Sequence, residues 1–81
     1  MGHLFIKAEY RADRGGRFVE GKALIGSTLL EVLQEAESLA RRLECGVGFD
    51  FNGNWAWIRP YDDPRAQMEW LRRIWSASRK G

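Results

Sequence analysis

The stretch that decides the fold is a predicted hairpin at residues 47–58, which read VGFDFNGNWAWI. Apolar residues alternate with small or polar ones along its first half, which is the period of a strand with one buried face. Asn52 and Gly53 form the strongest short hairpin signal, because both tolerate the positive φ angles of a two-residue type I′ turn. We therefore predict strands at about 47–52 and 54–59.

The register of this hairpin decides which face carries Trp55 and Trp57. A two-residue turn pairs Phe49 with Ala56 on the buried face and leaves both tryptophans on the opposite face. A three-residue turn that includes Asn54 shifts one strand by one residue, which moves both tryptophans beside Phe49. We favour the two-residue turn because its geometry suits the Asn-Gly pair.

Two further strands are predicted nearer the N-terminus, at about 4–12 and 18–25, because polar and apolar residues alternate there with period two. Gly15 and Gly16 lie between them and can form a two-residue turn.

Charged residues favour one register for this N-terminal hairpin. A turn of two glycines places Arg11 opposite Glu20 and Glu9 opposite Lys22 on the outer face, and each pair contributes roughly 0.2–1 kcal/mol. The same register pairs apolar residues on the inner face: Ala12 with Val19, Ala8 with Ala23, and Ile6 with Ile25.

The first predicted helix covers about 28–44. Thr28 and Glu31 have the spacing of a capping box, in which each side chain accepts a hydrogen bond from the other residue's backbone N–H. Apolar residues recur every three or four positions between these ends. We expect Gly46 to end the helix, since glycine adopts the left-handed conformation of a C-terminal cap most easily.

The second predicted helix covers about 64–76. Asp62 and Asp63 precede Pro64, so the carboxylates are read as helix-capping groups and the proline as the first helical residue, where its missing N–H costs nothing. This interpretation is favoured over acid–base chemistry or metal binding by the aspartate pair.

The predicted fold is a single α+β domain of 81 residues with the order ββαββα. It has a four-stranded antiparallel sheet with two amphipathic helices packed on one face. The other face of the sheet would be left open.

This open face is the candidate site. Two tryptophans on a water-facing sheet surface are unusual, and tryptophan and arginine are common in protein interfaces. We predict a protein-binding surface that consists of Trp55, Trp57, Arg59, Phe5, Arg11 and Asp50.

Four alternatives remain open for these residues. The tryptophans could cover Gly48 as local packing or lie in the core, or the face could pair with a second copy as a structural homodimer. Aromatic rings on a sheet also stack with unpaired bases. Single-stranded nucleic-acid binding is the less favoured partner class, because Glu9, Glu20 and Asp50 are predicted on this face and would repel phosphate.

A secondary basic patch is predicted at the C-terminal end: Arg72, Arg73, Arg79 and Lys80. It could bind an acidic partner, but a solvated helix end that complements the helix dipole explains it more simply.

Composition limits the chemistry. The chain has one cysteine, Cys45, and one histidine, His3, which we expect to be exposed near the terminus. A zinc site or a nucleophilic triad needs more such residues, so we expect no enzyme activity, no metal and no cofactor. A single cysteine cannot form an internal disulfide, so we expect a protein of the reducing cytoplasm. No apolar run approaches the roughly 18 residues of a membrane helix, so we expect no membrane binding.

The segment from Val47 to Pro60, followed by an aspartate-led helix, resembles a recurring piece of small phage and mobile-element proteins. This class includes anti-CRISPR inhibitors. The resemblance implies a phage-derived inhibitor in the host cytoplasm that binds a Cas protein or complex and occludes one of its surfaces.

Overall fold

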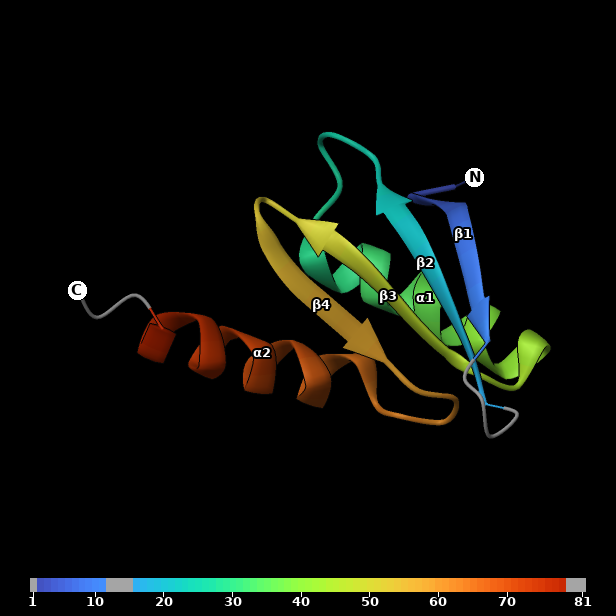
Figure 1. Cartoon of the computed structure of the whole chain (residues 1–81). Helices are drawn as coiled ribbons and strands as arrows, with labels where there is room; N and C mark the ends of the chain where they lie inside the picture. Colours follow the sequence, from blue (N-terminus) through green and yellow to red (C-terminus); the bar gives the residue numbers. More distant parts are fainter. Residues whose placement is uncertain (1, 12–15, 79–81) are drawn as a thin grey trace.

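The computed structural model describes residues 2–11 and 16–78, and it confirms the α+β class and the order ββαββα (Figure 1). The predicted strand end at Ala12 and Gly15 of the predicted turn lie outside the described residues. The elements are β1 (Leu4–Arg11), β2 (Arg17–Ala23), α1 (Leu29–Leu43), β3 (Gly46–Phe51), β4 (Asn54–Ile58) and α2 (Pro64–Ser78).

The four strands lie in the order β1-β2-β3-β4, and the two hairpins are antiparallel as predicted. The central pair differs: β2 runs parallel to β3, from Phe18 beside Gly46 to Lys22 beside Asp50, so the sheet is mixed. The cause is α1, whose 15 residues span about 22 Å. This helix returns the chain to the end of the sheet at which β2 began, and β3 therefore starts there too.

The register of the β3–β4 hairpin is the predicted one. Phe49 lies opposite Ala56, and φ is 52° at Asn52 and 83° at Gly53. Both turn residues thus adopt the positive φ values of the two-residue turn, which excludes the three-residue alternative.

The predicted register of the β1–β2 hairpin is wrong. Arg11 lies opposite Arg17 instead of Glu20, and Glu9 lies opposite Val19 instead of Lys22. The connection between the strands is longer than two residues, and a bulge interrupts the pairing between Ile6 and Ala8. The charges find different partners: Arg17 Nε lies 2.8 Å from Glu9 Oε2, and Lys7 Nζ lies 3.5 Å from Glu20 Oε2.

This bulge exchanges the two faces of β1 beyond Lys7, because the extra residue inverts the alternation of side chains. Tyr10 lies opposite Phe18 on the open face, whereas Glu9 and Arg11 lie on the helix side. Ile6 lies opposite Gly21 and Ala8 lies opposite Glu20, so the predicted inner pairs of Ile6 with Ile25 and of Ala8 with Ala23 do not form. Ile6 is 58% exposed, and Ile25, beyond the end of β2, is fully exposed.

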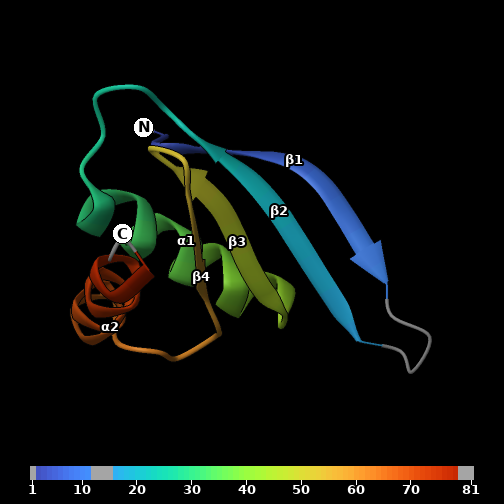
Figure 2. The same ribbon diagram turned by 60° about the vertical axis from the view of Figure 1, so that its left-hand side comes forward.

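The core lies between α1 and the sheet. Figure 2 shows α1 beneath the sheet, while the β1–β2 ribbon extends beyond both helices. Small alanines on α1 allow the helix to approach the strands closely, and α2 adds one fully buried side chain, Leu71. The other fully buried residues of the core are Val19, Val32, Leu33, Ala36, Ala40, Val47, Phe49, Ala56 and Ile58.

The predicted capping box of α1 forms. The backbone N–H of Glu31 donates to Thr28 Oγ1 at 3.2 Å, and that of Thr28 donates to Glu31 Oε1 at 2.8 Å. The latter bond lowers the pKa of Glu31. The helix does not end on Gly46, which begins β3. Glu44 adopts the left-handed conformation with φ 55°, and its N–H donates to the carbonyl of Ala40.

Helix α2 closes the outer edge of β4. Gln67 Nε2 donates to the carbonyl of Trp57 at 2.7 Å, and Trp75 Nε1 donates to that of Trp55 at 3.2 Å. These two carbonyls are therefore unavailable to a further strand. The helix thus covers an edge of the sheet as well as packing against α1 through its buried face.

Replacing Thr28 with alanine removes the side-chain acceptor at the start of α1. We expect Thr28→Ala to lower the free energy of unfolding by about 1 kcal/mol in urea denaturation followed by circular dichroism. Ser38→Ala, at an exposed position within the same helix, is the control and should leave stability unchanged or slightly higher. Equal effects of the two substitutions would contradict the capping role.

Candidate protein-binding face

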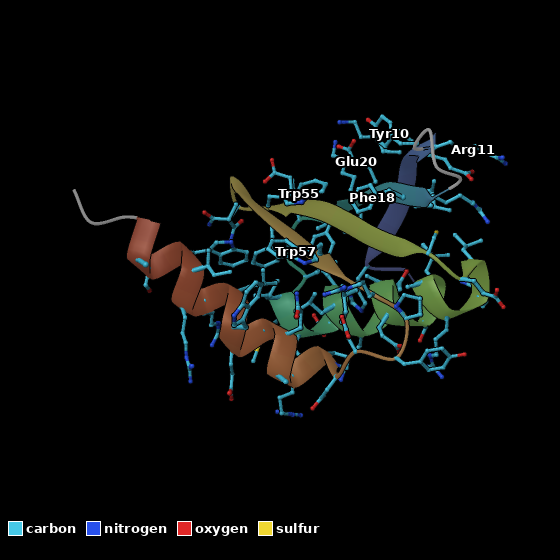
Figure 3. All side chains as sticks on the ribbon, turned by 60° about the horizontal axis from the view of Figure 1, so that its bottom comes forward. Tyr10, Arg11, Phe18, Glu20, Trp55 and Trp57 are labelled. Atoms are coloured by element: carbon cyan, nitrogen blue, oxygen red, sulfur yellow. The ribbon has the colours of Figure 1, made fainter. Side chains whose placement is uncertain are left out.

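The open face is the side of the sheet opposite α1. Strand pairing places four residues in one row across the open face. Phe5 lies opposite Lys22, Lys22 lies beside Asp50, and Asp50 lies opposite Trp55. Figure 3 shows how Tyr10, Phe18, Glu20, Trp55 and Trp57 are arranged along the sheet. We define the open face by these residues: Phe5, Lys7, Tyr10, Phe18, Glu20, Lys22, Asp50, Trp55, Trp57 and Arg59.

Phe18 and Trp55 meet above Gly48 at the centre of this face. Their ring centroids are 5.9 Å apart and the rings are tilted by 41°. A Cβ atom on Gly48 would lie less than 3 Å from both rings, so the position has no room for a side chain. Trp55 thus covers Gly48, as in the local-packing alternative, yet 42% of it remains exposed.

Trp57 connects the open face to α2. It lies opposite Gly48, and its ring makes an edge-to-face contact with Trp70 at 5.5 Å. Trp57 is half-buried, whereas Trp70 is 48% exposed. Aromatic surface therefore continues from Phe18 across β4 to the helix, and the edge-to-face contact contributes about 0.5–1.5 kcal/mol.

Tyr10, Glu20 and Lys7 form a polar network towards the β1 edge. The hydroxyl of Tyr10 donates to Glu20 Oε1 at 2.8 Å, and Lys7 Nζ approaches Glu20 Oε2 at 3.5 Å. The hydrogen bond and the negative charge of Glu20 raise the pKa of Tyr10. Glu20 is therefore already paired with two neighbours.

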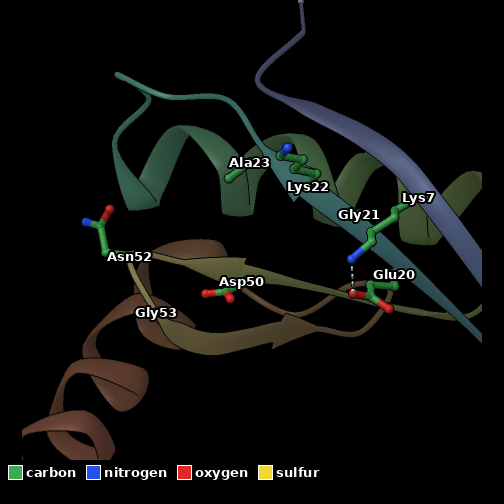
Figure 4. Close-up of a pocket in the computed structure, with 8 residues that line it drawn as sticks. All are labelled: Lys7, Glu20, Gly21, Lys22, Ala23, Asp50, Asn52 and Gly53. Atoms are coloured by element: carbon green, nitrogen blue, oxygen red, sulfur yellow. Dashed lines mark hydrogen bonds and ion pairs between the residues drawn. The ribbon is translucent and has the colours of Figure 1, made fainter.

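A shallow hollow of about 360 Å³ lies next to this network (Figure 4). Its rim carries both signs of charge, because Lys7, Lys22, Glu20 and Asp50 all line it. Asn52 and Gly53 of the β3–β4 turn form one end. A mixed rim suits a protein surface with polar groups of both signs better than a uniformly charged ligand.

Five of the six predicted contact residues lie on the open face: Trp55, Trp57, Arg59, Phe5 and Asp50. Arg59 packs with Phe18 above Gly46, as its Cγ lies 4.0 Å from the position of a Cβ there. Arg11 is the exception, because the bulge places it opposite Arg17 on the helix side. Tyr10 takes a place on the face that sequence reasoning assigned to Arg11.

The predicted basic patch and His3 lie away from the open face. Arg72 and Arg73 are exposed on α2, whereas Arg79 and Lys80 of the predicted basic patch lie outside the described residues. His3 is half-buried, contrary to expectation: its Nδ1 lies 2.9 Å from Ser27 Oγ, and its backbone N–H donates to Glu35.

The aspartates before α2 shape the turn that leads into it. Asp63 Oδ1 accepts from the N–H of Arg65 at 3.1 Å, and Asp62 Oδ2 accepts from that of Arg59 at 3.0 Å. Both carboxylates thus have structural roles.

No family model, no curated protein and no solved structure matches this chain. Among residues 2–11 and 16–78, no group of three or more His, Cys, Asp and Glu side chains could hold a metal ion. No helix in this described part is long and apolar enough to cross a membrane.

The packing of Phe18 and Trp55 onto Gly48 makes a test by substitution possible. We expect Gly48→Ala to lower the free energy of unfolding by about 1–3 kcal/mol, because the added methyl group displaces both rings. Gly46→Ala is the matched control, since its Cβ would meet Phe18 at an ordinary 3.5 Å. Urea denaturation followed by circular dichroism measures both, and a tolerated Gly48→Ala would contradict the packing.

The network around Glu20 can be tested by titration. In a Tyr61→Phe background, which leaves one tyrosine, ultraviolet absorbance should give Tyr10 a pKa above 10.0. Glu20→Gln should lower it, because the amide keeps an acceptor but removes the charge. A raised folded pKa means that the contribution of the Tyr10 hydrogen bond to stability is present below about pH 10 and is lost as the pH rises through the folded pKa. An unchanged pKa in Glu20→Gln would contradict the contact.

Proposed function

We propose that this protein is a non-enzymatic binding domain that acts by covering a surface of a larger protein. The observation that carries the proposal is the partly exposed aromatic cluster of Phe18 and Trp55 on the sheet face opposite α1. Monomeric proteins rarely leave such rings exposed without an interaction partner. Their position over Gly48 fixes them before binding, which lowers the entropy lost when a partner docks.

The charges favour a protein over single-stranded nucleic acid. Glu9 lies on the helix side and no longer opposes phosphate on this face, but Glu20 and Asp50 remain there. Lys7 is paired with Glu20, so it offers little free positive charge. A nucleic-acid platform needs a positively charged path beside its aromatic rings, and the mixed rim of the hollow does not provide one.

The resemblance of residues 47–60 to a recurring piece of small phage proteins, a class that includes anti-CRISPR inhibitors, suggests which partner to test first. We propose a Cas protein or complex in the cytoplasm of a bacterial host, with inhibition by occlusion.

The test is a binding measurement against purified Cas effector complexes with matched surface variants. Trp55→Ala should weaken binding by about 30-fold, the effect of a hot-spot residue worth about 2 kcal/mol. Lys22→Glu, beside the hollow, should also weaken binding. Arg42→Glu makes the same charge change on the exposed side of α1 and should leave affinity unaltered.

Circular dichroism must show that each variant is folded. Equal affinities for all variants, or the same loss in Arg42→Glu, would show that the open face is not the binding surface. Binding of a labelled oligonucleotide at low salt that weakens with added salt would instead support the nucleic-acid alternative.

A further inference from the structure

The two edges of the sheet differ in how they are covered. At β4, side chains of α2 occupy two strand carbonyls. β1 is the first strand in the sheet order, and Figure 2 shows no element of the described chain beyond it. An uncovered edge presents unpaired backbone N–H and C=O groups to any strand that approaches.

This uncovered strand also exposes apolar side chains on both of its faces. Phe5 is 57% exposed and Tyr10 is 52% exposed on the open face, while Ile6 is 58% exposed on the helix side. The charge of Lys7, in the middle of the strand, could repel an incoming strand, but its ammonium group points towards β2 and pairs with Glu20. Glu9 is likewise paired with Arg17 of β2, so two charged side chains of the strand point towards β2 and give the edge less of the protection that charges commonly provide.

We propose that β1 pairs antiparallel with β1 of a second copy, so that two sheets join into one of eight strands. A two-fold axis perpendicular to the sheet between Lys7 and Ala8 pairs the whole strand with its copy. The pairs are then Leu4 with Arg11, Phe5 with Tyr10, Ile6 with Glu9, and Lys7 with Ala8.

The bulge is what makes this register consistent. In a regular strand, Phe5 and Tyr10 would point to opposite faces, but the extra residue at the bulge brings both to the open face. Ile6 and Glu9 likewise share the helix side. Directly opposed residues must lie on the same face of a sheet, and all four pairs meet this condition.

The charges of the strand are compatible with its own copy. None of the four direct pairs opposes two like charges, and each Lys7 retains its own Glu20. Phe5 and Tyr10 form an aromatic pair twice, once on each side of the axis. Because the axis is perpendicular to the sheet, both open faces lie on the same side and would form one continuous surface.

The first measurement is sedimentation of the full chain over a range of concentrations. The proposal predicts a species of twice the chain mass whose fraction rises with concentration. Phe5→Lys should raise the dimer dissociation constant at least tenfold, because it removes both aromatic pairs. Ile25→Lys makes the same kind of change at a fully exposed loop residue outside β1 and should leave the constant unchanged.

The second measurement tests the register by disulfide formation in a Cys45→Ala background. Ile6→Cys mixed with Glu9→Cys should cross-link on oxidation, whereas each variant alone should not, because identical positions lie three residues out of register. A monomer at all concentrations would overturn the proposal. A dimer that is insensitive to Phe5→Lys and gives no mixed cross-link would overturn it too, since it would use another surface. These results do not depend on the larger protein partner, so either proposal can fail alone.

Discussion

The packing of α1 across one side of the sheet is the constraint on which the rest of the structure depends. Val32, Leu33 and Ala36 are completely buried against the strands. A chain of 81 residues has enough apolar side chains to cover one sheet face well, and small domains generally bury a modest share of their surface. The crossover of α1 also sets the parallel pairing of β2 and β3, and within residues 2–11 and 16–78 no helix covers the opposite face.

That open face is shaped by two glycines of β3, Gly46 and Gly48, which present no side chain to it. Gly48 allows Phe18 and Trp55 to meet above the central strands, and Gly46 allows Arg59 to pack beside Phe18. The same residues explain why the tryptophans are both structural and exposed: one edge of Trp55 covers Gly48, and the remainder faces water. Local packing and partner binding are therefore compatible uses of the same ring.

The sequence predicts the local features well, because each depends on a few neighbouring residues. Asn52 and Gly53 determine the turn and, with it, the face of Trp55. Thr28 and Glu31 determine the start of α1, although Gly46 is a misleading stop signal because Glu44 takes the left-handed conformation. The parallel pairing of β2 with β3 follows from the length of the crossover helix. The alternation of side chains along a strand does not predict the direction in which neighbouring strands run.

The bulge near Lys7 is the feature that strand periodicity cannot reveal. A two-residue turn at Gly15 and Gly16 gives chemically sensible charge pairs, yet Glu9 and Glu20 find Arg17 and Lys7 in a different register. One inserted residue moves Arg11 off the open face and brings Tyr10 onto it. The parts of the site on β3 and β4 are thus predictable, whereas those on the far half of β1 depend on a tertiary irregularity.

The central claim is that Trp55 lies on the open face above Gly48, and nuclear Overhauser contacts of its indole protons test it most directly. The account predicts strong contacts from the Trp55 ring to the Phe18 ring and to the α-protons of Gly48. Contacts from that ring to the buried side chains of Val32 and Phe49 would place Trp55 in the core and contradict the account.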